Sequence, residues 1–134
     1  NAYRETRIRT ASQGQLIVML YDEAIKQLDL AISYFHNEEK LDKIHNTIIK
    51  AQDIITELMV SLDFDRGGEI ASNLFNLYRF FNEQLMDANI KKSSEPLSHV
   101  KSFMAELRDT WAQVVKKSNQ DHADNQNGGI DISG

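Results

Sequence analysis

The residues best suited to chemistry in this chain lie at 63–68, where acidic side chains precede a pair of glycines. Asp63, Asp65 and Gly68 match positions 1, 3 and 6 of a calcium-binding EF-hand loop. Position 12 of such a loop supplies a bidentate carboxylate, and in this chain that position is Leu74. Because this ligand is missing, the sequence favours a polar turn with a glycine helix stop over a calcium site.

The other residues with reactive side chains form no recognisable catalytic or metal site. None of His36, His45, His99 and His122 lies on an apolar stripe, and no Glu-x-x-His motif of the di-iron type is present. The chain has no cysteine, no nucleophile elbow and no glycine-rich phosphate loop. The sequence therefore predicts a protein that is not an enzyme and needs no metal or cofactor.

Composition is that of one folded domain with an acidic surface. The chain has 134 residues, of which 41% are hydrophobic and 26% charged, and its formal net charge is -5. Affinity for nucleic acid or anionic membrane requires clustered Lys and Arg, so this balance argues against both. The opening NAYRETRIRT is too polar for a signal peptide, and no apolar run approaches the roughly 18 residues of a membrane helix. These features, with the absence of cysteine, predict a cytoplasmic protein.

Apolar residues recur at alternating spacings of three and four along four stretches, at about 12–36, 40–63, 68–91 and 95–117. This spacing places them on one face of an α-helix, and the short connections between the stretches favour antiparallel neighbours. The sequence therefore predicts an all-α fold, an antiparallel four-helix bundle. The stripe residues expected in its core are Ile17, Tyr21, Ala24, Leu28, Ala31, Phe35, Leu41, Ile44, Ile48, Ala51, Ile55, Leu58, Leu62, Ile70, Leu74, Leu77, Phe81, Leu85, Ala88, Leu97, Val100, Met104, Leu107, Trp111 and Val114.

The two ends of the chain do not follow this pattern. Residues 1–11 carry two isolated large apolar side chains, Tyr3 and Ile8, among three arginines, and we expect a weakly docking N-terminal arm. Residues 118–134 are small and polar without periodicity, and we expect a mobile tail. The predicted helical domain therefore covers residues 1–117, arm included.

The first helix is more apolar than one bundle seam requires. Its apolar positions span an arc of roughly 260° at 100° per residue, whereas a seam needs about 100° to 140°. Two interpretations remain open: the helix is central and contacts three neighbours, or its second face forms a groove for an apolar partner segment. The residues of that second face are Leu16, Met19, Leu20, Leu30 and Tyr34.

Three ordered blocks of sequence resemble one known family. TASQGQLIVMLYDEAIKQL at 10–28, KAQDIITEL at 50–58 and GGEIASNLFNLYRF at 67–80 are similar to blocks of the FliS family of flagellar secretion chaperones. Trp111 matches the tryptophan of the family's last helix, and the closing GGIDISG is also similar to the family. The resemblance covers about residues 3–117.

Two positions depart from the family pattern. Glu23 occupies a position where many members have glycine, and Phe80 replaces a common tyrosine. Phe80 puts in doubt any role for a hydroxyl group at that position.

The resemblance implies a cytoplasmic chaperone without catalytic activity. Members of the family bind the disordered C-terminal segment of flagellin, prevent its premature polymerisation and aid its delivery to the flagellar type III export gate. The family's N-terminal arm is thought to occupy part of the client surface when no client is bound. The alternative is a regulatory or homodimerising helical bundle without catalytic activity; for the chaperone we expect a monomer in the absence of client.

The resemblance and the apolar faces together suggest a partner-binding surface. We expect it to include Ile8, Thr10, Ala11, Leu16, Met19, Leu20, Tyr21, Ile48, Ile55, Asn73, Leu74, Leu77 and Tyr78.

Overall fold

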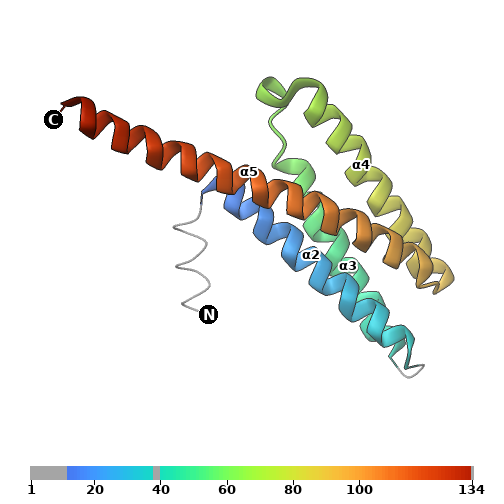
Figure 1. The fold of residues 1–134 in the computed structure, drawn as a ribbon. Helices are drawn as coiled ribbons and strands as arrows, with labels where there is room; N and C mark the ends of the chain where they lie inside the picture. The colour runs from blue at the N-terminus through green and yellow to red at the C-terminus, as the bar shows by residue number, and fades with distance from the viewer. Residues whose placement is uncertain (1–11, 38–39, 134) are drawn as a thin grey trace.

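The protein is a bundle of four α-helices, as a computed structural model shows for residues 12–37 and 40–133, with side chains described as far as residue 121. The helices are α2 (Gln13–Phe35), α3 (Leu41–Val60), α4 (Phe64–Lys91) and α5 (Glu95–Ser133). Both α2 and α4 pack against α3 and α5, which places α2 and α4 on one diagonal of the bundle (Figure 1). The predicted all-α four-helix bundle is confirmed.

The core consists of side chains that the helical stripes supply from all four helices. Tyr21, Tyr78 and Phe81 are its largest members, and each is almost completely buried. Close packing of such side chains supplies most of the stability of helices this long. The buried apolar residues are Tyr21, Ala24, Leu28, Ala31, Ile44, Ile48, Ala51, Ile55, Leu58, Ala71, Tyr78, Phe81, Leu85, Ala88, Leu97, Val100 and Met104.

The prediction of a core position is wrong for three residues of the stripes. Ile70 near the start of α4 is 70% exposed, Leu41 at the start of α3 is 54% exposed, and Val114 on α5 is 53% exposed. Each lies near an end of the bundle, where the neighbouring helix has ended or has diverged. Periodicity identifies the face of a helix and does not show how far along that face the packing continues.

The starts of α2 and α4 are fixed by side-chain caps. Ser12 and Gln15 form a reciprocal capping box at the start of α2, with N–O distances of 2.9 and 3.2 Å. Asp63 Oδ1 accepts hydrogen bonds from the main-chain N–H groups of Asp65 and Arg66, both at 3.1 Å. Each cap satisfies donors that the first turn of a helix leaves without a partner.

The paired glycines form a break inside α4 rather than a stop before it. The predicted helix began at residue 68, whereas α4 begins at Phe64 and is interrupted at Gly68, which has φ 50° and ψ -121°. An L side chain rarely adopts this conformation, so glycine is required here for its backbone freedom. The acidic residues of 63–68 thus cap and turn the chain.

Helix α5 extends further than the sequence predicts. It continues to Ser133 instead of ending near residue 117, and Figure 1 shows its C-terminal part projecting beyond the end of the bundle. A helix that packing has nucleated adds further residues without a new nucleation cost, so it continues where no apolar stripe marks it. The predicted tail therefore contains helix, which its polar composition concealed.

Charged side chains align α5 on α2. Arg108 Nε lies 2.7 Å from Asp22 Oδ1, and Lys101 pairs with Asp29 about two helical turns further along α2. At the start of α2, Gly14 allows a close approach, because a Cβ atom there would lie 2.7 Å from Val115 Cγ2. These contacts hold the two helices together along much of the length of α2.

None of the helices, over their described residues, is both long enough and apolar enough to cross a membrane.

Replacing Gly68 with alanine is expected to destabilise the fold by about 1–3 kcal/mol. The added Cβ meets no atom within 4 Å, so the cost comes from the positive φ alone. Urea unfolding of Gly68→Ala against the parent measures this difference. Glu69→Ala, at the exposed next residue, serves as the control and is expected to change stability by less than about 0.5 kcal/mol. Equal stabilities of Gly68→Ala and the parent would contradict the assigned backbone conformation.

Candidate functional site

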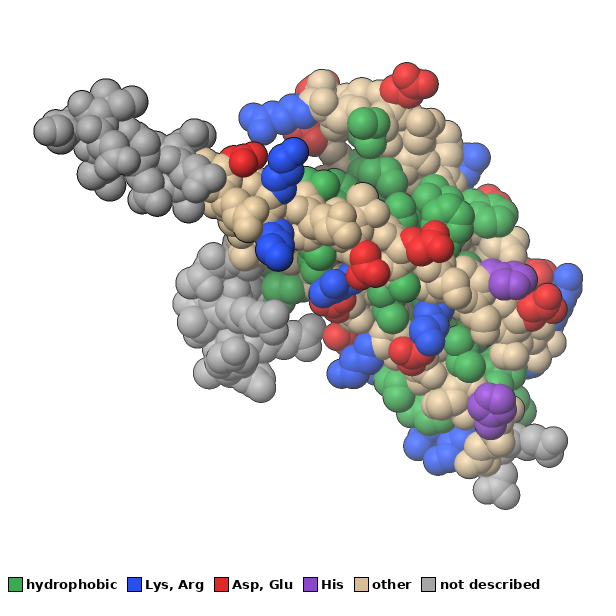
Figure 2. Space-filling model, in the orientation of Figure 1, with side chains coloured by type: hydrophobic (Ala, Val, Ile, Leu, Met, Phe, Trp, Pro, Cys, Tyr) green, Lys and Arg blue, Asp and Glu red, His purple; other side chains and the backbone are tan. Residues whose placement is uncertain are grey.

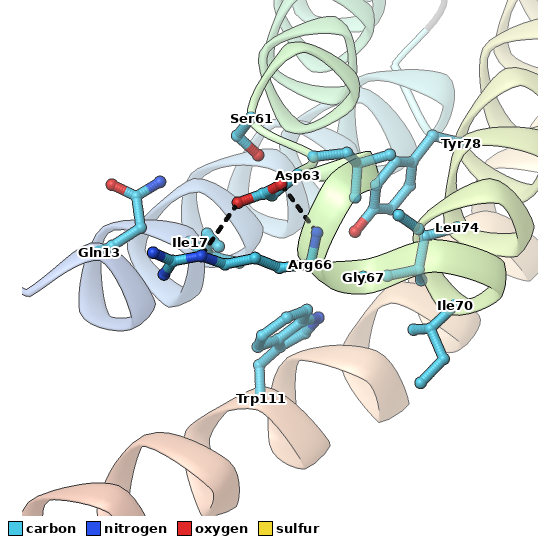
Figure 3. A pocket seen from close by; sticks show the side chains of 12 residues that line it. Gln13, Ile17, Ser61, Asp63, Arg66, Gly67, Ile70, Leu74, Tyr78 and Trp111 are labelled. Carbon is cyan, nitrogen blue, oxygen red and sulfur yellow. Dashed lines mark hydrogen bonds and ion pairs between the residues drawn. The ribbon is translucent and has the colours of Figure 1, made fainter.

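A pocket opens at the end of the bundle where α4 begins. Its volume is about 290 Å³, and it is bounded by the start of α2, the turn between α3 and α4, the first turns of α4 and the middle of α5 (Figure 3). The lining residues are Gln13, Ile17, Ser61, Leu62, Asp63, Arg66, Gly67, Ile70, Ala71, Leu74, Tyr78 and Trp111.

The pocket exists because α4 and α5 diverge toward this end (Figure 1). The ion pair of Arg108 with Asp22 holds α5 against α2. On the opposite side, Asn82 Nδ2 donates to Thr56 Oγ1 at 3.2 Å, which ties α4 to α3. On the two sides of the wedge, the helices thus bond to different neighbours.

The walls of the pocket are apolar and its rim is polar. Ile17, Leu74 and Trp111 all pack against the core from their places in the wall. On the rim, Arg66 Nε lies 3.7 Å from Asp63 Oδ2, and the Arg66 side chain is 92% exposed. An ion pair this exposed contributes little energy, so the Arg66 side chain is free to reorient when a partner arrives.

Two tyrosine hydroxyl groups lie beneath the pocket. The oxygens of Tyr21 and Tyr78 are 2.5 Å apart, and their ring centroids are 6.3 Å apart. Burial raises the pKa of Tyr21 above its ordinary value, and the neighbouring Tyr78 raises it further, whereas the nearby Trp111 indole lowers it. Burial also raises the pKa of Tyr78, while the hydrogen bond with Tyr21 lowers it. Both hydroxyls therefore stay protonated at neutral pH and act as neutral hydrogen-bonding groups.

Exposed apolar side chains continue from the pocket along α4 and α5. Phe80 and Phe103 are each about half exposed, and the Phe103 ring stands edge-on to buried Phe81 with centroids 5.4 Å apart. Val114 on α5 is also about half exposed. Figure 2 shows hydrophobic side chains gathered over these two helices. We call these exposed side chains, Phe80, Phe103 and Val114, the apolar strip. The pocket and the strip together make an apolar surface of the kind that receives a helical or extended segment.

The predicted partner-binding residues fall into four groups. Leu74 and Tyr78 line the pocket, whereas Tyr21, Ile48 and Ile55 lie in the core and present no exposed side-chain surface. Ile8, Thr10 and Ala11 lie outside the described residues. Leu16, Met19, Leu20 and Leu77 are half-buried, and Asn73 is exposed.

Several residues of the pocket were not predicted from the sequence to bind a partner. Ile70 and Trp111 were expected in the core, because their spacing matches the core stripes. Leu62 was also expected in the core, as the last residue of the second stripe, and Gly67 lies outside every stripe. The signal that could have found them is position: all four lie beside a turn or at an end of the predicted bundle.

The raised tyrosine pKa values predict a loss of stability in alkali. Each hydroxyl ionises near pH 10 in the unfolded chain and at higher pH in the folded protein. Above about pH 10 the unfolded state loses these protons first, so each tyrosine lowers the free energy of unfolding by up to about 1.4 kcal/mol per pH unit. Urea unfolding between about pH 9 and 11 measures this slope. The double variant Tyr21→Phe/Tyr78→Phe should show a shallower slope, and equal slopes would contradict the assignment.

Comparison with known proteins identifies the family to which this chain belongs. The family model described as flagellar protein FliS matches residues 1–118. The flagellar secretion chaperone FliS of Bacillus subtilis is 31% identical over 120 residues, which cover 90% of this chain and 88% of that protein. The chaperone of the same name from Salmonella typhimurium is 31% identical over 115 residues, covering 85% of this chain and 84% of the relative. With a family match over most of its length and relatives of this similarity, the chain belongs to the FliS family of flagellar secretion chaperones.

Proposed function

We propose that this protein binds the disordered C-terminal segment of flagellin in the cytoplasm and keeps it from polymerising before export. The same binding would aid delivery of flagellin to the flagellar type III export gate. The observation that carries the proposal is the apolar pocket between α4 and α5, with Ile70 exposed at its edge and apolar side chains continuing beyond it.

The dimensions of the pocket favour a segment over a folded partner. A volume of about 290 Å³ accommodates a few apolar side chains and is at the small end of the range for ligand pockets. A helix laid along the strip would insert residues at spacings of three and four into such a site. A flagellin segment that has not yet assembled exposes apolar surface of this kind, and covering it gains about 25 cal/mol for each Å² removed from water.

The start of α2 suggests how the N-terminal arm could regulate this site. Gln13, the first residue of α2, lies on the rim of the pocket, so the chain reaches the helix beside the site. A segment that leaves from this point is close enough to compete with a client. The competition of residues 1–11 with client is part of the proposal.

A second candidate is a protein that forms homodimers through surplus apolar residues. It is favoured by Val60 on α3 and Ile90 on α4, which are strongly exposed and do not line the pocket. The mass in solution at micromolar concentration separates the two. A monomer that forms a one-to-one complex with flagellin supports the chaperone, and a dimer without affinity for flagellin supports the alternative.

Ile70→Asp is expected to weaken flagellin binding at least 10-fold, because it places a carboxylate at the apolar edge of the pocket. Its fold should persist, since Ile70 is 70% exposed. Isothermal titration with a flagellin C-terminal peptide measures the affinity.

The matched control is Ile90→Asp, which makes the same substitution on the same helix at a residue that is 76% exposed. Its position near the other end of α4 leaves the pocket unchanged. Affinity close to that of the parent is expected for this variant. Equal loss in both variants would point to a general effect of charge on α4, and no loss in either would remove the pocket from the binding surface.

Deleting residues 1–9 is expected to tighten binding of the same peptide several-fold. A plug that is docked in most molecules reduces the apparent affinity by the fraction of molecules whose site is free, so its removal restores the intrinsic value. The deletion keeps Ser12, which caps α2. Unchanged affinity would refute competition by the arm, and weaker binding would indicate that the arm holds the client.

A further inference from the structure

We propose that the Tyr78 hydroxyl donates a hydrogen bond to the flagellin segment that occupies the pocket. The site would then select segments that place an acceptor oxygen at the floor of the pocket. This inference rests on the proposed function, because it assigns a specificity-determining group to the same pocket.

Only one of the two tyrosines is in contact with the pocket. Tyr78 lines the pocket, and Figure 3 shows its hydroxyl end directed among the lining side chains. Tyr21 is completely buried and is not among the lining residues. Of the two bonded hydroxyls, Tyr78 is therefore the one in contact with the pocket.

The two hydroxyl groups together carry more hydrogens than their mutual bond uses. The Tyr21 and Tyr78 oxygens lie 2.5 Å apart, and either hydroxyl can be the donor in this contact. One hydrogen bond between two hydroxyls uses only one of their two hydrogens. If Tyr21 donates, the Tyr78 hydrogen is left without an acceptor.

Reversing the bond between Tyr21 and Tyr78 still leaves one hydroxyl hydrogen without an acceptor. If Tyr78 donates to Tyr21, the Tyr21 hydrogen is left over in the core, where its burial without a partner is costly. The arrangement that directs the spare hydrogen into the pocket is favoured because an occupant or water can accept it there.

Two polar side chains of the pocket, Ser61 and Asp63, form hydrogen bonds with other groups of the protein. Ser61 donates its hydroxyl hydrogen to the Leu58 carbonyl at 2.7 Å. Asp63 accepts two main-chain hydrogen bonds at the start of α4 and pairs with Arg66 at the exposed rim. No hydrogen bond from Tyr78 to an acceptor other than Tyr21 is present among residues 12–37 and 40–121. The acceptor is therefore expected from the occupant.

The chemistry of a suitable occupant follows from this arrangement. Its apolar side chains would fill the walls, and one oxygen would reach the floor: a main-chain carbonyl at the end of a helical turn, or a side-chain amide or carboxylate. A site that desolvates a hydroxyl donor discriminates strongly against a partner without an acceptor. The apolar walls supply affinity, and Tyr78 would supply part of the selectivity.

The test compares Tyr78→Phe with Tyr21→Phe in the full chain, using a flagellin C-terminal peptide and isothermal titration. Both variants lose the same hydroxyl-to-hydroxyl bond, and Tyr21→Phe keeps the donor that faces the pocket. Tyr78→Phe is expected to weaken binding about 5- to 10-fold, and Tyr21→Phe less than about 3-fold. Thermal unfolding by circular dichroism checks that each variant is folded at the temperature of titration.

A spectroscopic measurement on the unmodified sequence tests the same point without substitution. With tyrosine labelled at ¹³Cζ, the Tyr78 resonance should move on peptide binding, and by more than that of Tyr21, because a new acceptor contacts its hydroxyl. Equal affinities of the two variants, or an unmoved Tyr78 resonance in the bound protein, would overturn the inference while leaving the proposed function intact. A parent protein that does not bind the peptide would overturn the proposed function, and the inference with it.

Discussion

The buried contact between Tyr21 and Tyr78 joins α2 and α4 across the diagonal of the bundle, and the pocket depends on it. Two aromatic rings with centroids 6.3 Å apart fill the centre at this level. Beyond these rings, toward the start of α4, the core gives way to the pocket. This happens because α4 diverges from α5 and Ile70 lies outside the packed interior. A pair of smaller side chains would leave a cavity beneath the pocket, because the surrounding structure relaxes only partially.

Polar groups this deep in a small core lower its stability unless each finds a partner. The hydroxyls of Tyr21 and Tyr78 partly satisfy one another through the contact between their oxygens. Leucine at the tyrosine positions would pack without this demand. The arrangement places one of the two hydroxyl-bearing side chains, that of Tyr78, in the lining of the pocket.

Much of the fold could be predicted from the sequence, because core packing and helical periodicity express the same constraint. Leu28, Ile48 and Leu85 stand in unbroken stripes and are completely buried. The site was less accessible to this reasoning. Ile70 continues its stripe without interruption, yet the divergence of α4 from α5 exposes it. Divergence of two helices is a property of their relative placement, which no single helical pattern records. The length of α5 could not be predicted for a related reason, since a helix can continue beyond a packed region without an apolar pattern.

Family blocks include the glycines at 67 and 68, and the structure gives a reason for the second of them, because its φ of 50° allows the chain to turn between the capped first turn and the rest of α4. That turn carries Asp63 and Arg66 to the rim and leaves Ile70 at the edge of the opening. The conformation of this glycine and the tyrosine pair below therefore both shape the opening. A partner segment that entered it would meet side chains already held by packing, and such preorganisation lowers the entropic cost of binding.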